Sequence, residues 1–137
     1  MALRVDLTFD TMDAESLAEF WKLALGYEDE PPPAPFTTRA EWAASFGEPD
    51  DDEGGGAWLH DPAGVGPRLC FLDVPERKVA KNRLHIDVRV GKGDGAWERI
   101  VAKSEQLVKA GGRVLTTVDG HHIVMADPEG NEFCVAA

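Results

Sequence analysis

The sequence predicts an α+β fold made of two copies of one strand–helix–three-strand unit. Three observations predict it. Along the chain, the spacing of hydrophobic residues switches between a period of 2 residues and a period of 3.6 residues. The same order of elements occurs twice, and each copy has an Asp-Pro-x-Gly turn before its last strand. Two such units can bury a shared apolar face, which neither copy can do alone. The 137 residues are therefore expected to form a single domain, 1–137.

The first copy covers about residues 1–75 and begins with a strand predicted over 3–9, where apolar and polar residues alternate. A helix follows, with Asp13 as its N-cap and Gly26 as its stop, and its apolar residues recur at helical spacing. The remaining strands expected in this copy are 27–30, 57–60 and 68–73.

An insertion over residues 31–56 interrupts the first copy. Its proline-rich start excludes helix interior, whereas Thr38 followed by a glutamate three residues later predicts a capped short helix. The acidic run at 50–53 is expected to be a solvated loop. Long insertions often cover sites, so Trp42 and Phe46 are candidate lid residues. The alternative is that both side chains anchor the insertion to the body of the domain.

The second copy covers about residues 82–137 and repeats the order of the first. A strand is predicted over 84–90 and a helix over 95–110. The remaining strands of this copy are expected at 113–118, 121–126 and 131–136. Residues 4–7 match 83–86, and the turn at 61–64 matches the turn at 127–130. The repeated order of elements is the main support for two equivalent modules.

Composition excludes several function classes. The net charge of −11 repels phosphate backbones and anionic lipid, so we expect neither a nucleic-acid partner nor a membrane partner. No apolar run approaches the length of a membrane span, and the N-terminus has no signal pattern, so a cytoplasmic location is expected. The two cysteines, Cys70 and Cys134, are then expected to be reduced.

Several segments together resemble the glyoxalase-like group of the vicinal oxygen chelate superfamily. The segments that carry the resemblance are 17–21, 25–26, 74–76, 81–87 and 127–134, and it covers nearly the whole chain. The resemblance implies paired βαβββ modules that form a curved mixed-sheet cup, and a homodimer. The superfamily includes glyoxalases, extradiol dioxygenases, epimerases, antibiotic-modifying enzymes and drug-sequestering proteins, so fold analogy does not choose the reaction.

The resemblance also implies where a metal would bind. Metal-using members take one ligand from the first strand and one from the last strand of each module. Carried over by motif, these positions fall on Asp6, Leu72, His85 and Cys134, the last-strand pair being aligned through the phenylalanine that precedes each. Leucine cannot bind a metal, so no metal or other cofactor is expected. If a divalent metal binds, Asp6, His85 and Cys134 are its expected ligands, a trio better suited to zinc than to iron or manganese.

Strand alternation singles out His85 and Asp87, which share the polar face of their strand, with Asp6 and Thr8 on the corresponding face of the first strand. A carboxylate near an imidazole orients it and raises its basicity, so His85 and Asp87 are the candidate catalytic residues, with His85 as general acid or base. The alternative is a buried His–Asp pair that closes a hydrogen-bond network. The ligand-binding candidates are Asp6, Thr8, Leu72, Cys134, Trp42 and Phe46.

The expected function is the binding of a small molecule by a glyoxalase-like protein without the usual complete metal site. One interpretation is a lyase or isomerase acting on a small carbonyl or hydroxy compound. The alternatives are a non-catalytic, ligand-sequestering protein of the drug-resistance type, or a metal-dependent lyase or dioxygenase with an unusual ligand set. An aromatic-lined cavity without a reactive pair would favour sequestering, whereas a His85–Asp87 contact inside a closed cavity would favour catalysis.

Overall fold

The computed structural model describes residues 1–47 and 55–137, so the acidic run at 50–53 lies outside the described residues. The first module comprises β1 (Leu7–Thr11), α1 (Ala14–Leu25), β2 (Glu28–Asp29), α2 (Arg39–Ala44), β3 (Gly56–His60) and β4 (Leu69–Asp73). The second comprises β5 (Ile86–Arg89), α3 (Ala96–Lys109), β6 (Arg113–Val118), β7 (His122–Ala126) and β8 (Glu132–Ala136). The predicted α+β class with two βαβββ modules is confirmed, with α2 as the helix of the insertion.

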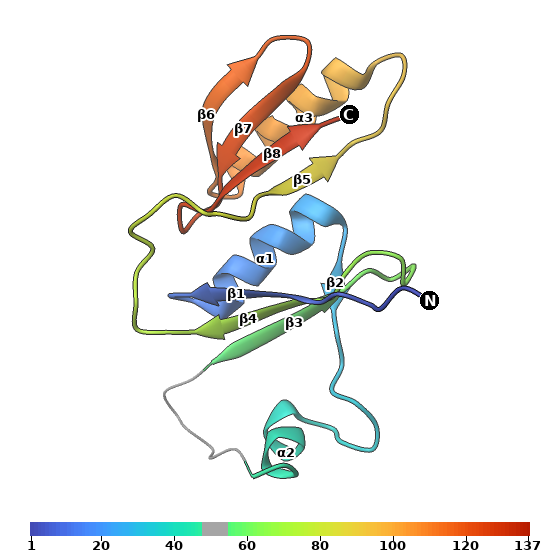
Figure 1. Cartoon of the computed structure of the whole chain (residues 1–137), viewed down its shortest axis with the longest axis vertical. Helices are drawn as coiled ribbons and strands as arrows, with labels where there is room; N and C mark the ends of the chain where they lie inside the picture. The colour runs from blue at the N-terminus through green and yellow to red at the C-terminus, as the bar shows by residue number, and fades with distance from the viewer. Residues whose placement is uncertain (48–54) are drawn as a thin grey trace.

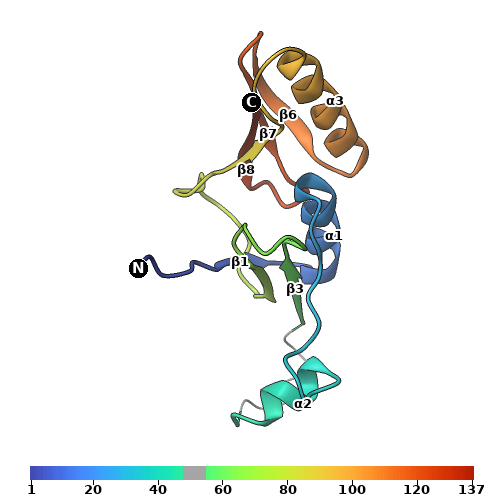
Figure 2. The ribbon, with the colours of Figure 1, turned by 90° about the vertical axis from the view of Figure 1, so that its right-hand side faces the viewer.

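Each module folds into a four-stranded mixed sheet, in the orders β1-β4-β3-β2 and β5-β8-β7-β6. The first and last strands of each module are parallel neighbours, and the other pairs are antiparallel. Figure 1 shows the two modules arranged along the long axis of the molecule. Figure 2 shows α1 and α3 on one side of the sheets. The N-terminal segment and the linker between the modules project on the other side.

The helix ends follow the predicted capping residues. The Asp13 side chain accepts a hydrogen bond from the Ser16 amide at 3.1 Å, and Gly26 closes α1 in the left-handed conformation with φ of 70°. At α2, the Thr38 hydroxyl accepts from the Glu41 amide at 3.1 Å. In the described chain, no helix has the length and apolar character needed to cross a membrane.

The predicted start of the first strand was wrong. It begins at Leu7 rather than at residue 3, because its partner strand β4 begins at Leu69 and offers no ladder to the residues before Leu7. The side chain of Leu3 is 91% exposed, although it fits the alternating pattern. Alternation therefore marks which residues can form a strand, while the length of the neighbouring strand decides which residues do.

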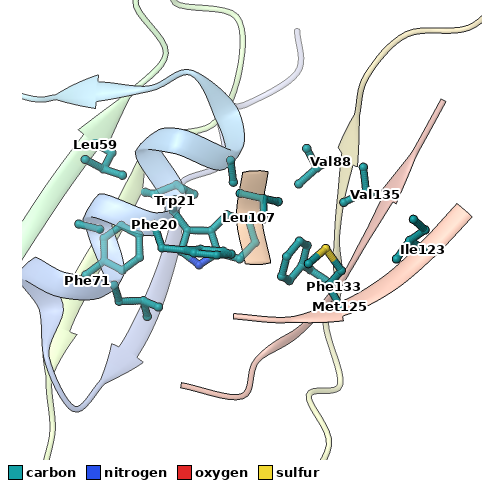
Figure 3. Close-up of a cluster of buried hydrophobic side chains, with 14 of the residues drawn as sticks. Phe20, Trp21, Leu59, Phe71, Val88, Leu107, Ile123, Met125, Phe133 and Val135 are labelled. Atoms are coloured by element: carbon teal, nitrogen blue, oxygen red, sulfur yellow. The ribbon is translucent and has the colours of Figure 1, made fainter. Parts of the chain in front are cut away.

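One aromatic core joins the two modules (Figure 3). The Trp21 ring of α1 lies 5.4 Å from the Phe9 ring and 5.1 Å from the Phe133 ring of the second module. Gly112 of the second module lets the Phe20 ring of the first module pack closely, because an added Cβ would lie 3.0 Å from an edge carbon of that ring. Burying side chains of this size contributes about 2 kcal/mol each, so the module contact is a main source of stability.

Candidate functional site

A cleft of about 590 Å³ lies between the two modules, where residues of β1, β5, β8 and the linker between β4 and β5 meet. Its apolar lining comes from both modules and the linker, and it comprises Leu7, Phe9, Trp21, Val74, Leu84, Ile86 and Phe133. A cleft of this volume with aromatic walls is the usual kind of site for a small organic molecule.

Charged and polar residues form the rim of the cleft. The Glu132 carboxylate accepts hydrogen bonds from the Asn82 amide and from the Lys78 ammonium, both at 3.0 Å. The Asn82 amide and then Lys78 lower the pKa of Glu132 to about 2. The Asn82 side chain also donates to the Asn131 side-chain oxygen at 3.2 Å. These contacts fasten the linker to the start of β8 along one side of the cleft.

Among the predicted ligand-binding residues, Thr8 lines the cleft. Asp6 is held instead in an ion pair with Arg68, whose Nη1 lies 2.9 Å from a carboxylate oxygen. Thr8 pairs with Cys70 and Asp87 pairs with Cys134 across the parallel strand pairs, so these four side chains share the helix-free faces of the two sheets. The structure brings them to one side of the molecule, and of these four side chains only Thr8 lines the cleft.

His85 and Asp87 are exposed, which contradicts the alternative of a buried His–Asp network. The His85 Nε2 atom lies 2.7 Å from the Asn82 carbonyl oxygen, and the Asp87 carboxylate accepts from Arg89 at 3.4 Å. Across residues 1–47 and 55–137, no hydrogen bond joins His85 to Asp87. The two candidate catalytic residues therefore interact with different partners in this structure.

Strand register corrects how the two modules were aligned. Leu59 and Met125 each stand two residues before the aspartate of their Asp-Pro-x-Gly turn. Leu59 pairs with Leu69, whereas Met125 pairs with Phe133. Phe133 therefore corresponds to Leu69 and not, as predicted, to Phe71.

It follows that Cys134 corresponds to Cys70, and the assignment of Leu72 as its equivalent was wrong. The physical reason is the longer loop between β3 and β4, residues 61–68, compared with 127–131 in the second module. Both cysteines thus occupy the same position on the helix-free face of their sheet. Leu72 lies two residues further along the same face, where its side chain is exposed.

The four equivalent positions, Asp6, Cys70, His85 and Cys134, do not fit a metal ion. Burial raises the pKa of both cysteine thiols, so the thiolates that would bind a metal are disfavoured at neutral pH. Asp6 is paired with a guanidinium group. In the part of the chain that the structure describes, no three His, Cys, Asp or Glu side chains gather to hold a metal.

Trp42 and Phe46 lie in a cluster at the insertion and not in the lining of the cleft. The Trp42 ring is 5.0 Å from the Phe46 ring and 6.4 Å from the Trp58 ring of β3. The Arg39 guanidinium lies 4.4 Å above the Trp58 ring and donates to the Glu30 carbonyl oxygen at 3.1 Å. These contacts fit the interpretation that the insertion is anchored to the first module.

The linker between β4 and β5, for which the sequence predicted no role in the site, contributes Arg77, Lys78, Asn82 and Arg83 to the cleft. A signal was present, because basic residues gather over 77–83 in a chain with a net charge of −11. Only the folded chain shows that this connection runs beside the aromatic core.

The comparisons with known proteins agree with this architecture. The chain matches the family described as Glyoxalase-like domain over residues 6–136. Among curated proteins, no sequence match is found.

Solved structures share the fold at low sequence identity. The fosfomycin resistance protein FosX from Listeria monocytogenes, complexed with Mn(II) and sulfate ion, is 12% identical with a TM-score of 0.65, over 100% of this chain and 93% of that chain. A possible glyoxalase from Bacillus cereus is 14% identical with a TM-score of 0.63, over 99% and 100% of the two chains. A glyoxalase/bleomycin resistance protein/dioxygenase family enzyme from Burkholderia phytofirmans is 14% identical with a TM-score of 0.62, over 97% of each chain.

Proposed function

Because the chain belongs to the glyoxalase-like domain family, we propose that it binds a small organic molecule in the cleft between its modules and holds it without changing it chemically. The observation that carries this proposal is the composition of the cleft. Its lining combines aromatic rings of both modules with a polar rim, and the candidate catalytic pair of His85 and Asp87 is not joined by a hydrogen bond within the described residues.

The physical case rests on the apolar lining. Phe9 and Ile86 are partly buried side chains that pack against the core and also line the cleft, so their positions are set by the core before any ligand arrives. A preformed apolar surface binds without the cost of ordering mobile side chains. Leu84 adds exposed apolar area, with 64% of its surface accessible, that a ligand would cover. Sequestering needs only this affinity, whereas catalysis also needs a reactive group aimed into the cleft.

The experiment is a screen of small carbonyl compounds, hydroxy compounds and antibiotics by ligand-observed NMR, followed by affinity measurement on two variants. Leu84→Asp removes apolar lining from the cleft and should weaken binding roughly tenfold or more. Val79→Asp is the matched control, because Val79 is equally apolar, lies in the same linker and does not line the cleft. Equal weakening by the two variants would contradict binding in the cleft.

A second candidate is turnover of the bound molecule by His85. It is supported by one contact: the Asn82 carbonyl that holds the His85 ring belongs to a residue of the cleft lining. The imidazole thus stands beside the rim, where a small movement would bring it to a ligand. Hits from the screen should be incubated with wild type and with His85→Asn. If product forms with wild type but not with His85→Asn, and both proteins bind the compound, the function is catalysis rather than sequestering.

We also propose a homodimer located in the cytoplasm. All residues of β6 are exposed, and the apolar side chains of Val114, Leu115 and Val118 lie among them. Such exposed apolar groups on an edge strand favour association with a second copy. Light scattering should give twice the chain mass, and Leu115→Glu should shift the distribution toward monomer more than Val65→Glu, an exposed loop control. A monomer at high protein concentration would contradict the proposal.

A further inference from the structure

The linker between β4 and β5 is locally basic in an acidic chain. Residues 76–83 carry four cations, Arg77, Lys78, Lys81 and Arg83, against the single acid Glu76, while the whole chain has a net charge of −11. A cationic segment of this kind attracts anions that the rest of the surface repels. Its position therefore matters for any charged ligand.

Two of these cations face the cleft without a partner of their own. Arg77, Lys78 and Arg83 all line it. Lys78 is engaged with Glu132 at 3.0 Å, which leaves that pair close to neutral. Neither Arg77 nor Arg83 makes a side-chain hydrogen bond or ion pair with the residues that the structure describes. Two guanidinium groups thus remain available beside the aromatic lining.

Three acidic residues also line the cleft: Asp10, Glu76 and Glu132. Glu132 is paired with Lys78, and Glu76 directly precedes Arg77 in the chain. Arg83 lies six positions beyond Arg77, shortly before β5, in a stretch of the linker that carries no acidic residue. Arg83 therefore places positive charge at the β5 end of the linker, where it would attract the charged end of a ligand.

We propose that the cleft selects an organic anion with an apolar body, the anionic group lying at Arg77 and Arg83 and the body lying against Phe9, Leu84 and Ile86. This rests on the proposed small-molecule function and names the ligand class for the same cleft. A planar guanidinium group donates paired hydrogen bonds to the oxygens of a carboxylate, sulfonate or phosphonate. The accessible apolar side chains of the lining provide contact area for the uncharged part of such a molecule.

The test compares two fluorescent probes with nearly the same apolar body. 8-Anilino-1-naphthalenesulfonate carries one sulfonate, and N-phenyl-1-naphthylamine carries no charge. Wild type should bind both, and Arg77→Gln/Arg83→Gln should bind the sulfonate roughly tenfold more weakly while its affinity for the neutral probe stays within twofold. Asp10→Asn should tighten the sulfonate by a smaller factor, about twofold, because a repelling carboxylate is lost.

The control variant Lys92→Gln/Arg113→Gln removes the same total charge from exposed positions outside the cleft lining, and it should leave both affinities unchanged. Equal loss of sulfonate binding in this control and in the arginine variant would overturn the proposal, because the effect would then come from net charge. If the arginine variant loses neither probe, anion selection fails while the small-molecule site stands. If neither probe binds wild type, the cleft itself fails as an apolar site.

Discussion

The indole N–H of Trp21 donates a hydrogen bond to the carboxylate of Asp127 at 3.1 Å, and both side chains are buried. This bond joins the helix of the first module to the Asp-Pro-x-Gly turn of the second. The same carboxylate also accepts from the Glu129 amide and from the backbone and side-chain nitrogens of Asn131. Asp127 thus links turn geometry to the packing between modules.

Asp127→Ala should lower the free energy of unfolding by about 3 kcal/mol or more, because it leaves the buried Trp21 N–H and the partly buried nitrogens of Glu129 and Asn131 without an acceptor. Asp61→Ala is the matched control in the equivalent turn of the first module. The Asp61 carboxylate accepts from the amides of Ala63, Val65 and Gly66, but these groups are near solvent and can bond to water instead. Urea unfolding should show a loss of at most about 1 kcal/mol for Asp61→Ala. Equal losses would contradict the role given to the bond with Trp21.

Glu132 predicts how stability depends on pH. Its pKa is lowered to about 2 in the folded protein, chiefly by the Asn82 amide and by Lys78, from an ordinary value of 4.5. The unfolded chain therefore binds this proton first as the pH falls. The stabilisation is present above about pH 4.5 and is lost as the pH falls through about 2.

The expected result is that Glu132→Gln lowers the melting temperature at pH 7 and that its difference from wild type shrinks steadily below pH 4.5. Calorimetry between pH 2 and pH 7 measures this difference. Glu105→Gln, which removes an exposed carboxylate of α3, is the control and should change the melting temperature little. A Glu132→Gln difference that persists unchanged at the acid end would show that the carboxylate does not hold the linker.

Arg39 is predicted to hold the insertion to the first module. Its guanidinium group lies over Trp58, beside Trp42, and its Nη2 donates to the carbonyl oxygens of Glu30 and Pro31. Because α2 spans only Arg39–Ala44, it is too short to persist without such contacts.

Arg39→Ala should therefore speed hydrogen exchange of the α2 amides while global unfolding changes by only about 1 kcal/mol. Arg39→Lys keeps the charge but loses the planar stack on Trp58. Its α2 amides should exchange at a rate between those of wild type and Arg39→Ala. Unchanged exchange at α2 in the alanine variant would mean that the aromatic rings alone anchor the insertion.

Purified protein should contain no stoichiometric iron, manganese or nickel. The physical reason is that Asp6 is bound to Arg68, the Cys70 and Cys134 thiols are favoured in their protonated form, and His85 lies against a backbone carbonyl. Elemental analysis after exposure to each metal measures this directly. About one equivalent of metal that is lost on His85→Ala would overturn the prediction.

Local sequence patterns were enough to predict the elements and their order. Asp13, Gly26 and Thr38 act through neighbours within a few residues, so their capping roles are readable without the fold. The repeat was also readable, because each module must present the same apolar faces in the same order to build a shared core. These features depend on local geometry and on periodicity, which a single chain displays in its residues.

The contacts across the modules, in contrast, depend on how the whole chain folds. Strand pairing identifies Cys70, and not Leu72, as the equivalent of Cys134. A match between two phenylalanines in the sequence does not reveal this register. Arg83 lines the cleft because contacts with residues at the start of β8 fix the path of the linker. These residues lie about fifty positions further along the chain. Burial, partners and charge environment are properties of this three-dimensional packing, so no local pattern could have shown them.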